Sequence, residues 1–466
     1  MSEELVEYEP FEARIQQFKA KFTLQFFLIA IPILAFFIKL IIIRNIEPVI
    51  NFNGSRYGGA WLGADGENYL NALYGFLKDG LYSKDHLLEY WPAGYPFLLW
   101  LISKISLTHI LSLVSISQSA FYGYASYYFV KQLRNTKLQR YLFTFALILA
   151  ANPTLSLSSL AIGYESPIAS CMLMVVGLII KSKLNPEDNR FWLRVVAVGG
   201  FFALASFMQP RWILTTIVIA AIWAITYKNL KQQALILAIV MAVMAIAPVA
   251  LIVRNHKAGN GSVVSTNLGT TMRIGAGDTT SGSYMHSGPD VPCKPIAPAT
   301  TTTDNQMVKC VFKWYAGHPV KAVRLFINKS LYFWSPWYGP RMNGTMARNP
   351  WLKIDPVINI ERGSQQGHDL VYGIIGKLIS WLWVLATMSL FFIGFFWLRS
   401  YKGIYRTLAW LTFTPVVISW LVAMGTIGDH RFRLPTMSLA LVLQVLGYFA
   451  LRQRAKTGSF KVEVQP

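Results

Sequence analysis

Apolar runs long enough to enter a membrane recur along the whole sequence, and this recurrence constrains the fold more than any other feature. A bilayer requires about 20 apolar residues from each spanning helix, and 54% of the 466 residues are hydrophobic. The sequence predicts an all-α integral membrane protein with about ten transmembrane helices, within bounds of 9–13. The ten runs are 22–43, 108–130, 138–153, 167–180, 192–208, 211–227, 233–253, 371–398, 407–427 and 434–451.

Positive charges in the connectors predict how the chain is oriented. Cytoplasmic connectors of membrane proteins retain Lys and Arg. Basic clusters precede the first run and follow every second run, as at 131–140 and 399–406. Both termini are therefore expected in the cytoplasm. The first run is longer than the apolar core of a signal peptide and no small-residue cleavage site follows it, so we expect it to be retained.

The net charge of +21 indicates an anionic partner. In a soluble protein this value would suggest nucleic acid, but here the cytoplasmic connectors contain about half of the cations. The remainder favours anionic lipid or phosphate. We therefore expect a membrane lipid as partner, and no nucleic acid.

Two long connectors are expected on the extracytoplasmic face, at residues 44–107 and 254–370. Such segments commonly carry function. We expect them to contain helices lying on the membrane surface, at 66–80 and 94–106 in the first connector and a basic helix at 314–334 in the second.

The connectors also suggest a division of the chain into three parts. Residues 1–253 form a transmembrane catalytic half that includes the first connector, and residues 254–370 form an extracytoplasmic cap. Residues 371–466 contain the last transmembrane helices and a cytoplasmic tail.

Asp65 is the leading candidate for a catalytic group. It lies in the first long connector, within Gly63-Ala-Asp-Gly-Glu-Asn-Tyr69. A carboxylate at the membrane surface can act as a general base on a lipid-borne substrate. The alternative is that it caps the helix predicted to follow, because Asp is a favoured N-cap. Glu67 and Glu165 are expected on the same face, so all three acids are candidates for one site.

Four arginines fall at predicted extracytoplasmic ends of membrane helices, where membrane-flanking cations are least expected. Arginine matches phosphate oxygens through a rigid, bidentate fork. We interpret these residues as ligands of a lipid phosphate; the alternative is that they pair with connector acids or reach ordinary lipid headgroups. The four are Arg211, Arg254, Arg431 and Arg433.

Aromatic residues of the connectors are candidates for stacking on a sugar, although aromatic belts at membrane interfaces use the same residues. The candidate sugar or acceptor contacts are Tyr69, Tyr90, Trp91, Tyr95, Tyr338 and His430. Cys293 and Cys310 share the second long connector, where we expect a disulfide. No histidine pair has the spacing of metal ligands, and we expect no structural metal site.

The order of these signals resembles the integral-membrane glycosyltransferases of the GT-C class, in the branch containing protein O-mannosyltransferases and lipid A aminoarabinose transferases. The resemblance runs through nearly the whole chain. Its pieces are Gly63 to Tyr69, Trp91-Pro-Ala-Gly-Tyr-Pro96, Asn152-Pro153 with Tyr164-Glu-Ser166, Val253-Arg-Asn255 with Gly261 to Gly269, His318 to Arg324 with Phe333-Trp334, and Asp429-His-Arg-Phe-Arg-Leu-Pro435.

The resemblance implies inverting transfer of one sugar from a polyprenyl-monophosphate donor to a lipid, glycolipid or cell-envelope glycan. The site would lie on the extracytoplasmic face of a bacterial plasma membrane. Asp65 would activate the acceptor hydroxyl, and the arginines would neutralise the departing phosphate. The resemblance implies a lipid-linked sugar donor and no obligatory cofactor, and it leaves dependence on a divalent cation open.

Two departures from the family pattern bear on these expectations. Met208-Gln-Pro-Arg211 stands where the family more often has Arg-Pro, which leaves open which cation meets the phosphate. The first connector has one Asp where protein O-mannosyltransferases have an adjacent Asp-Glu pair, and this favours a lipid or glycan acceptor over a protein.

Three other functions remain as alternatives. A glycan ligase or polymerase with a lipid-diphosphate donor shares the arginines and long connectors but needs no carboxylate at Asp65. A flippase or transporter of lipid-linked sugars would be expected to have polar or broken helices at the bilayer midplane. A structural scaffold offers no account of the arginines.

Overall fold

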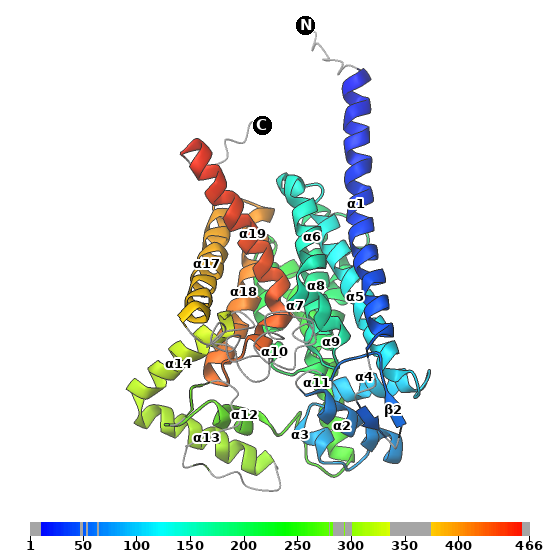
Figure 1. Cartoon of the computed structure of the whole chain (residues 1–466), viewed down its shortest axis with the longest axis vertical. Helices are drawn as coiled ribbons and strands as arrows, with labels where there is room; N and C mark the ends of the chain where they lie inside the picture. The colour runs from blue at the N-terminus through cyan, green and yellow to red at the C-terminus, as the bar shows by residue number, and fades with distance from the viewer. Residues whose placement is uncertain are drawn as a thin grey trace.

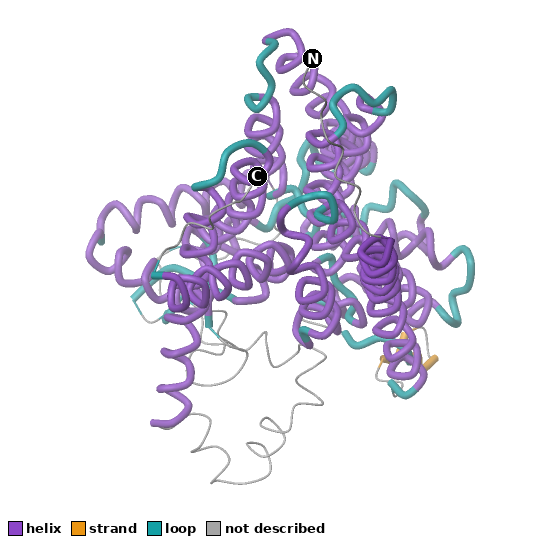
Figure 2. Tube along the Cα trace, turned by 90° about the horizontal axis from the view of Figure 1, so that it is seen from above, coloured by secondary structure: helices purple, strands orange, loops and turns teal. Residues whose placement is uncertain are grey.

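The computed structural model describes residues 11–46, 50–52, 55–62, 65–278, 280–282, 293, 301–335 and 374–458. The protein is an all-α integral membrane protein, as the sequence predicts, with one short antiparallel hairpin formed by β1 (Ile50–Phe52) and β2 (Ser55–Tyr57). Figure 2 shows helices dominating the trace, with the hairpin at one edge. Tyr338 and the tail beyond residue 458 lie outside the described residues.

Helices occupy all ten of the predicted apolar runs. They are α1 (Phe11–Arg44), α5 (Ile110–Gln132), α6 (Leu142–Ala151), α8 (Glu165–Leu184), α9 (Phe191–Met208), α10 (Trp212–Ala224), α11 (Leu230–Lys257), α17 (Ile374–Arg399), α18 (Ile404–Gly425) and α19 (Leu434–Thr457).

Fewer than ten of these helices satisfy the length and apolarity of a membrane span. Within the described residues seven helices do so, or eight if a bent pair counts as one span. The pair consists of Lys137–Ala151 and Pro153–Leu160, bent by 53°. Of the remaining two predicted runs, α10 is only 13 residues long, and α5 contains many Ser and Tyr residues together with Gln118.

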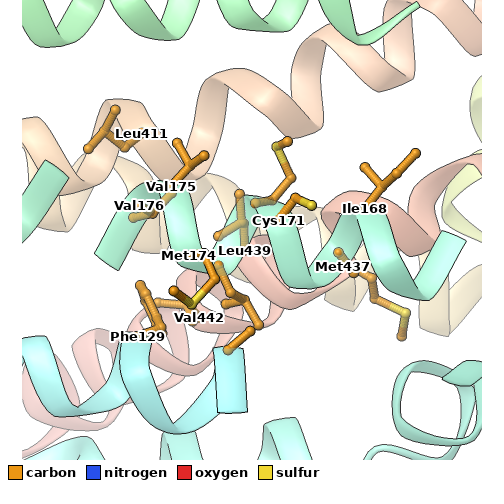
Figure 3. Packing of buried hydrophobic residues seen from close by; sticks show 14 of the residues in the cluster. Phe129, Ile168, Cys171, Met174, Val175, Val176, Leu411, Met437, Leu439 and Val442 are labelled. Carbon is orange, nitrogen blue, oxygen red and sulfur yellow. The ribbon is translucent and has the colours of Figure 1, made fainter. Parts of the chain in front are cut away.

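The core of the helix bundle surrounds α8. Most of this helix is buried, and it packs against α5, α9, α18 and α19. Figure 3 shows Ile168, Cys171 and Val175 of α8 beside Leu439 of α19, with Phe129 of α5 close by. Because α8 is enclosed by its neighbours, the position of its first residue, Glu165, is fixed by the whole bundle.

Helices α17 and α19 approach closely through a pair of glycines. A Cβ at Gly394 would lie 1.9 Å from the carbonyl oxygen of Leu443, and one at Gly447 would lie 2.1 Å from that of Leu390. Small residues permit such contacts between membrane helices. This packing holds α19, and therefore the residues that precede it, against the bundle.

The two ends of the bundle differ. In Figure 1 the start of α1 and the end of α19 lie at one end, while α2 (Gly66–Asp79), α3 (Leu87–Tyr90), α12 (Leu268–Ile274) and α13 (Thr301–Gly317) lie at the other. We call this second end the site end.

The helices predicted to lie on the membrane surface are present but differ in detail. Helix α2 buries Leu70, Leu73 and Phe76 and packs against α4 (Gly94–Ser103), so this face of α2 contacts protein. The prediction of a single basic helix over 314–334 is wrong, because this segment belongs to two helices. The segment is divided at His318 into α13 and α14 (Pro319–Trp334), because Pro319 lacks the N–H needed to continue a helix.

Candidate active site

Asp65 is brought to the start of α8 by backbone pairing between distant segments. The N–H of Trp61 donates to the carbonyl of Leu160 at 2.9 Å, and the N–H of Ile162 donates to the carbonyl of Trp61 at 2.8 Å. The first long connector therefore runs beside the turn that leads to Glu165. A Cβ at Gly66 would lie 3.1 Å from that of Ile162, so the two segments are in close contact.

The side chain of Asp65 binds an arginine and does not cap α2. Asp65 occupies the N-cap position, but its side chain makes no capping hydrogen bond. Arg431 Nη2 instead donates to Asp65 Oδ2 at 2.5 Å. The alternative that Asp65 caps the following helix is therefore wrong, and its carboxylate is directed toward Arg431.

Glu165 is held by the same guanidinium. Arg431 Nε donates to Glu165 Oε1, so one arginine bridges both carboxylates. The turn before Glu165 is narrow, because a Cβ at Gly163 would lie 2.4 Å from Glu165 Oε2. The side chains of Asp65, Glu165 and Arg431 are 15%, 14% and 11% exposed, so this ion triad is largely buried.

A short 3-10 helix, η5 (His430–Arg433), presents Arg431 to the two acids. Asp429 Oδ1 accepts the backbone N–H of Arg431 at 2.8 Å, and Ser419 Oγ donates to the carbonyl of Phe432 at 2.7 Å. These contacts join η5 to the end of α18 and fix the direction of the Arg431 side chain. The side chain of His430 lies outside the described residues.

Arg211 lies beside the triad with unused donors. Its Nε and Nη2 atoms are buried and have no hydrogen-bond partner among the described residues. Its Cζ is 4.5 Å from the ring centroid of Phe432 and 5.7 Å from that of Tyr164. Arg431 contacts the same two rings, at 5.8 Å each. The two guanidiniums therefore share one pair of aromatic side chains.

A buried donor without a partner costs about 1–3 kcal/mol, and more if it is charged. Arg211 bears this cost next to two carboxylates that both bind Arg431. The arrangement provides a place where an external anion can complete the hydrogen bonding of Arg211.

Tyr69 is a buried neighbour of the triad. Its hydroxyl is buried without a hydrogen-bond partner among the described residues. Burial, followed by the proximity of Tyr164 and Asp65, raises the pKa of Tyr69 well above its ordinary value, so the phenol stays protonated. Its ring packs edge-on against Tyr95 at 5.0 Å and Trp91 at 5.8 Å. A ligand hydroxyl or phosphate can accept the free phenolic hydrogen.

Three other predicted aromatic contacts, Tyr90, Trp91 and Tyr95, pack around Tyr69 or its neighbours. Tyr95 is buried, and its hydroxyl accepts the N–H of Gly163 at 2.8 Å, which ties α4 to the turn before α8. Tyr90 packs edge-on against Trp91 at 5.3 Å. Trp91 therefore connects Tyr90 to Tyr69.

Arg254 lies apart from the triad, and each of its three guanidinium nitrogens already donates a hydrogen bond. Its guanidinium donates to the backbone carbonyls of Leu81, Ser83 and Leu88 and to the side chain of Asn255. Four acceptors surround a buried side chain that joins α11 to the segment between α2 and α3. We assign Arg254 a structural part in place of the predicted phosphate contact.

Arg433 and Glu67 are also outside the triad. Arg433 is buried, and its Nη2 donates to the carbonyl of Ser335 at 3.4 Å, with Cζ 5.7 Å from the ring centroid of Trp334. It faces the end of α14, at the border of the described residues. Glu67 is exposed on α2 and makes no ion pair within the described part of the chain.

The second long connector contains a disulfide. Cys293 is bonded to Cys310 of α13, with Cα atoms 6.0 Å apart. Cys310 lies beside a small apolar cluster that includes Met272, Val311 and Trp314, and Cys293 belongs to that cluster. The disulfide therefore fastens the chain before α13 to this cluster.

Two residues of the site were not among the predicted candidates. The rings of Tyr164 and Phe432 contact the guanidiniums of both Arg211 and Arg431. Tyr164 precedes the predicted residue Glu165 in the sequence, and Phe432 follows the predicted residue Arg431. That adjacency, and their place within the motifs Tyr164-Glu-Ser166 and Asp429 to Pro435, were the available signals. Their aromatic faces favour cations.

The described residues contain no group of three or more His, Cys, Asp or Glu side chains that could hold a metal ion. The charged cluster is instead made of two carboxylates and two guanidiniums. These elements define an all-α membrane protein with an arginine–carboxylate site at the ends of its helices.

Comparison with known proteins gives structural neighbours only. No protein-family model and no curated protein matches the sequence. Two solved structures of the oligosaccharyltransferase AglB from Archaeoglobus fulgidus are similar to the chain. For the complex with an inhibitory peptide and a dolichol-phosphate, the identity is 12% and the TM-score 0.45, over 95% of this chain and 52% of that one. For the apo form the values are 12%, 0.46, 93% and 53%. The chain thus spans about half the length of these neighbours.

Proposed function

We propose that the protein is a glycosyltransferase that moves one sugar from a polyprenyl-monophosphate donor to a hydroxyl of a lipid, glycolipid or cell-envelope glycan. The observation that carries the proposal is the placement of Arg211, with buried and unpaired donors, beside the triad of Asp65, Glu165 and Arg431. One carboxylate to accept a proton and one free guanidinium to receive a phosphate are the two groups that this transfer needs.

The step proposed is an inverting displacement at the anomeric carbon. The acceptor oxygen forms a bond to this carbon while the bond to the donor phosphate oxygen breaks. The electron pair of the broken bond remains on the phosphate, which Arg211 stabilises. The hydroxyl proton passes to the carboxylate of Asp65, so atoms and charges balance without a redox partner.

Arg431 and Tyr69 prepare the site for this step. Arg431 orients the carboxylate of Asp65 through their ion pair. Glu165 fixes Arg431 from the other side. The free hydroxyl of Tyr69 donates to a sugar hydroxyl or a phosphate oxygen near Asp65.

The position of the site at the ends of the membrane helices suits a substrate whose phosphate lies at the surface of the bilayer. We place this end on the extracytoplasmic face, since the basic connectors are at the opposite end. The motifs that resemble the GT-C class include Asp65, Glu165 and Arg431, which agrees with their assembly into one site.

The proposal is tested by transfer of radiolabelled sugar in proteoliposomes that hold the full-length chain. The donors are a panel of polyprenyl-monophosphate sugars, and the acceptor is a glycan and lipid extract. We expect Asp65→Asn to lower turnover by about 100-fold to 10,000-fold, the usual contribution of a general base. Glu67→Gln, which changes an exposed acid two positions away, is the matched control and should retain activity.

Two results would count against the proposal. Full turnover by Asp65→Asn would remove the base. Turnover of the wild type with lipid-diphosphate donors but with no monophosphate donor would assign the site to a ligase or polymerase.

A further inference from the structure

Lys39 lies inside the membrane-spanning part of α1, where a cation is expensive. The side chain is 3% exposed. No hydrogen bond or ion pair of Lys39 is found within the described part of the chain, and its ammonium lies over the ring of Tyr122, with Nζ 4.9 Å from the centroid. An ionisable residue inside a membrane helix requires a partner, and its identity indicates function.

The open space next to Lys39 is an apolar groove. It has a volume of about 410 Å³ and lies between α1 and the broken pair of α6 and α7 (Pro153–Leu157). Apart from Lys39 and Ser156, the side chains that line it are all apolar. Leu34 and Ile38 of α1 and Leu147 of α6 line the groove and are 63%, 50% and 45% exposed, so hydrocarbon chains of the bilayer can enter from the side.

The depth of Lys39 suits a headgroup at the membrane surface. The residue lies five positions before Arg44, the last residue of α1, which is about 7.5 Å along the helix at 1.5 Å per residue. An ammonium here can reach upward to a phosphate while the chain of the same lipid fills the groove.

We infer that this groove binds an anionic phospholipid of the surrounding bilayer, with its phosphate at Lys39 and one acyl chain against α1, α6 and α7. The charge of Lys39 requires an anion, and the apolar lining requires a hydrocarbon chain. None of the residues of the ion triad, nor Arg211, lines the groove. The lipid is therefore distinct from the sugar donor proposed above.

The experiment compares lipid retention and thermal stability of the full-length chain. The protein is placed in nanodiscs of phosphatidylcholine, with or without phosphatidylglycerol, and retained lipid is counted by native mass spectrometry. For the wild type we expect retention of phosphatidylglycerol and a higher melting temperature in its presence. Lys39→Ala should weaken retention about tenfold, as expected for loss of one hydrogen bond to a charged group.

Three further variants sharpen the comparison. Lys39→Arg should retain the lipid, because it keeps the cation. Ala35→Phe should lose it although Lys39 remains, because the ring fills the groove. Lys104→Ala is the matched control: Lys104 also lies over an aromatic ring, that of Trp100 at 4.7 Å, but is exposed and outside the groove, and its loss should change nothing.

Each contrary outcome overturns the inference. Equal retention by wild type and Lys39→Ala would show that the cation does not hold the lipid. Retention of phosphatidylcholine equal to that of phosphatidylglycerol would show that the bound lipid need not be anionic. Preferential retention of added polyprenyl phosphate would make the groove part of the substrate site. A lower melting temperature for Lys39→Ala than for the wild type in lipid-free detergent would indicate that the ammonium of Lys39 interacts with the C-terminal carbonyls of α6 and not with a lipid.

Discussion

Arg431 Nη2 lies 2.5 Å from Oδ2 of Asp65, although the two residues are 366 positions apart in the chain. Through its Nε the same guanidinium holds Glu165, so a single side chain connects the first long connector, the start of α8 and the segment before α19. A partly buried arginine in this position orients both acids and offsets their mutual repulsion.

The first prediction concerns Arg431→Gln. Breaking a buried ion pair by removing one partner typically costs about 3–5 kcal/mol, because the remaining charges stay uncompensated. We expect the melting temperature in detergent to fall and sugar transfer to be lost. Adding Asp65→Asn and Glu165→Gln to this variant should restore stability without restoring activity. If Arg431→Gln alone were as stable as the wild type, the triad would not hold the three segments together.

Arg211→Met and Arg254→Met should behave in opposite ways. Arg211 has buried donors without partners, so replacing it removes no internal hydrogen bond and should leave the melting temperature unchanged or higher. Turnover should fall about 100-fold or more, because the phosphate loses its cation. Arg254→Met leaves the carbonyls of Leu81, Ser83 and Leu88 without a donor and should lower the melting temperature. The measurements are thermal unfolding and initial rates on the same preparations. The reverse pattern would exchange the roles assigned to the two residues.

Chelation of divalent cations should have little effect on transfer. Arg431 lies between the two carboxylates that a metal ion would otherwise bridge. We therefore expect the rate in excess EDTA to remain within about twofold of the untreated rate, a change of less than 0.5 kcal/mol in the barrier. Reactivation by added Mn²⁺ or Mg²⁺ after a complete loss in EDTA would show that a metal displaces Arg431 during turnover.

Lys329 should make stability depend on pH. This lysine of α14 is fully buried, its Nζ donates to Tyr315 Oη at 2.9 Å, and burial lowers its pKa from 10.5 to about 7. Between pH 7 and 10.5 the unfolded chain binds more protons at this site than the folded chain, so stability rises with pH across that window. Below pH 7 Lys329 is protonated in both the folded and the unfolded chain, so the full cost of burying its charge lowers the free energy of unfolding.

Lys329→Met removes the titrating group and keeps the apolar stem. We expect the variant to be stabilised most at pH 6–7 and its stability to be flatter from pH 7 to 10 than that of the wild type. Thermal unfolding across this range measures both effects. Lys321→Met, at an exposed lysine of the same helix, is the control and should leave the pH dependence as it is. Parallel pH curves for Lys329→Met and the wild type would contradict the assignment.

The sequence was sufficient for the helices because apolarity is a local property. Each predicted run became a helix, and the composition alone indicated a membrane protein. It was not sufficient for the number of spans: α10 ends at Ala224 after 13 residues, and nothing in the run 211–227 marks that point. The division at His318 was visible in Pro319 but was overridden by the periodicity on both sides.

The candidate site was only partly accessible to sequence reasoning, because partners at long range decide each residue's part. Arg211 and Arg254 look alike in the sequence, each at the predicted end of an apolar run. One has free donors beside Tyr164, and the other is enclosed by backbone carbonyls. Lys39 was not predicted as a functional residue, because a single cation hardly changes the apolarity of the first run.

The distance along the chain between Asp65 and Arg431 also sets an order of events during synthesis. Asp65 and Glu165 leave the ribosome long before Arg431, which precedes the last membrane helix. Until that helix has been inserted, the two acids have no cation between them. A product truncated before residue 431 therefore lacks the ion triad even with nine of the ten predicted apolar runs in place, and synthesis of the last helix is the step that assembles the proposed site.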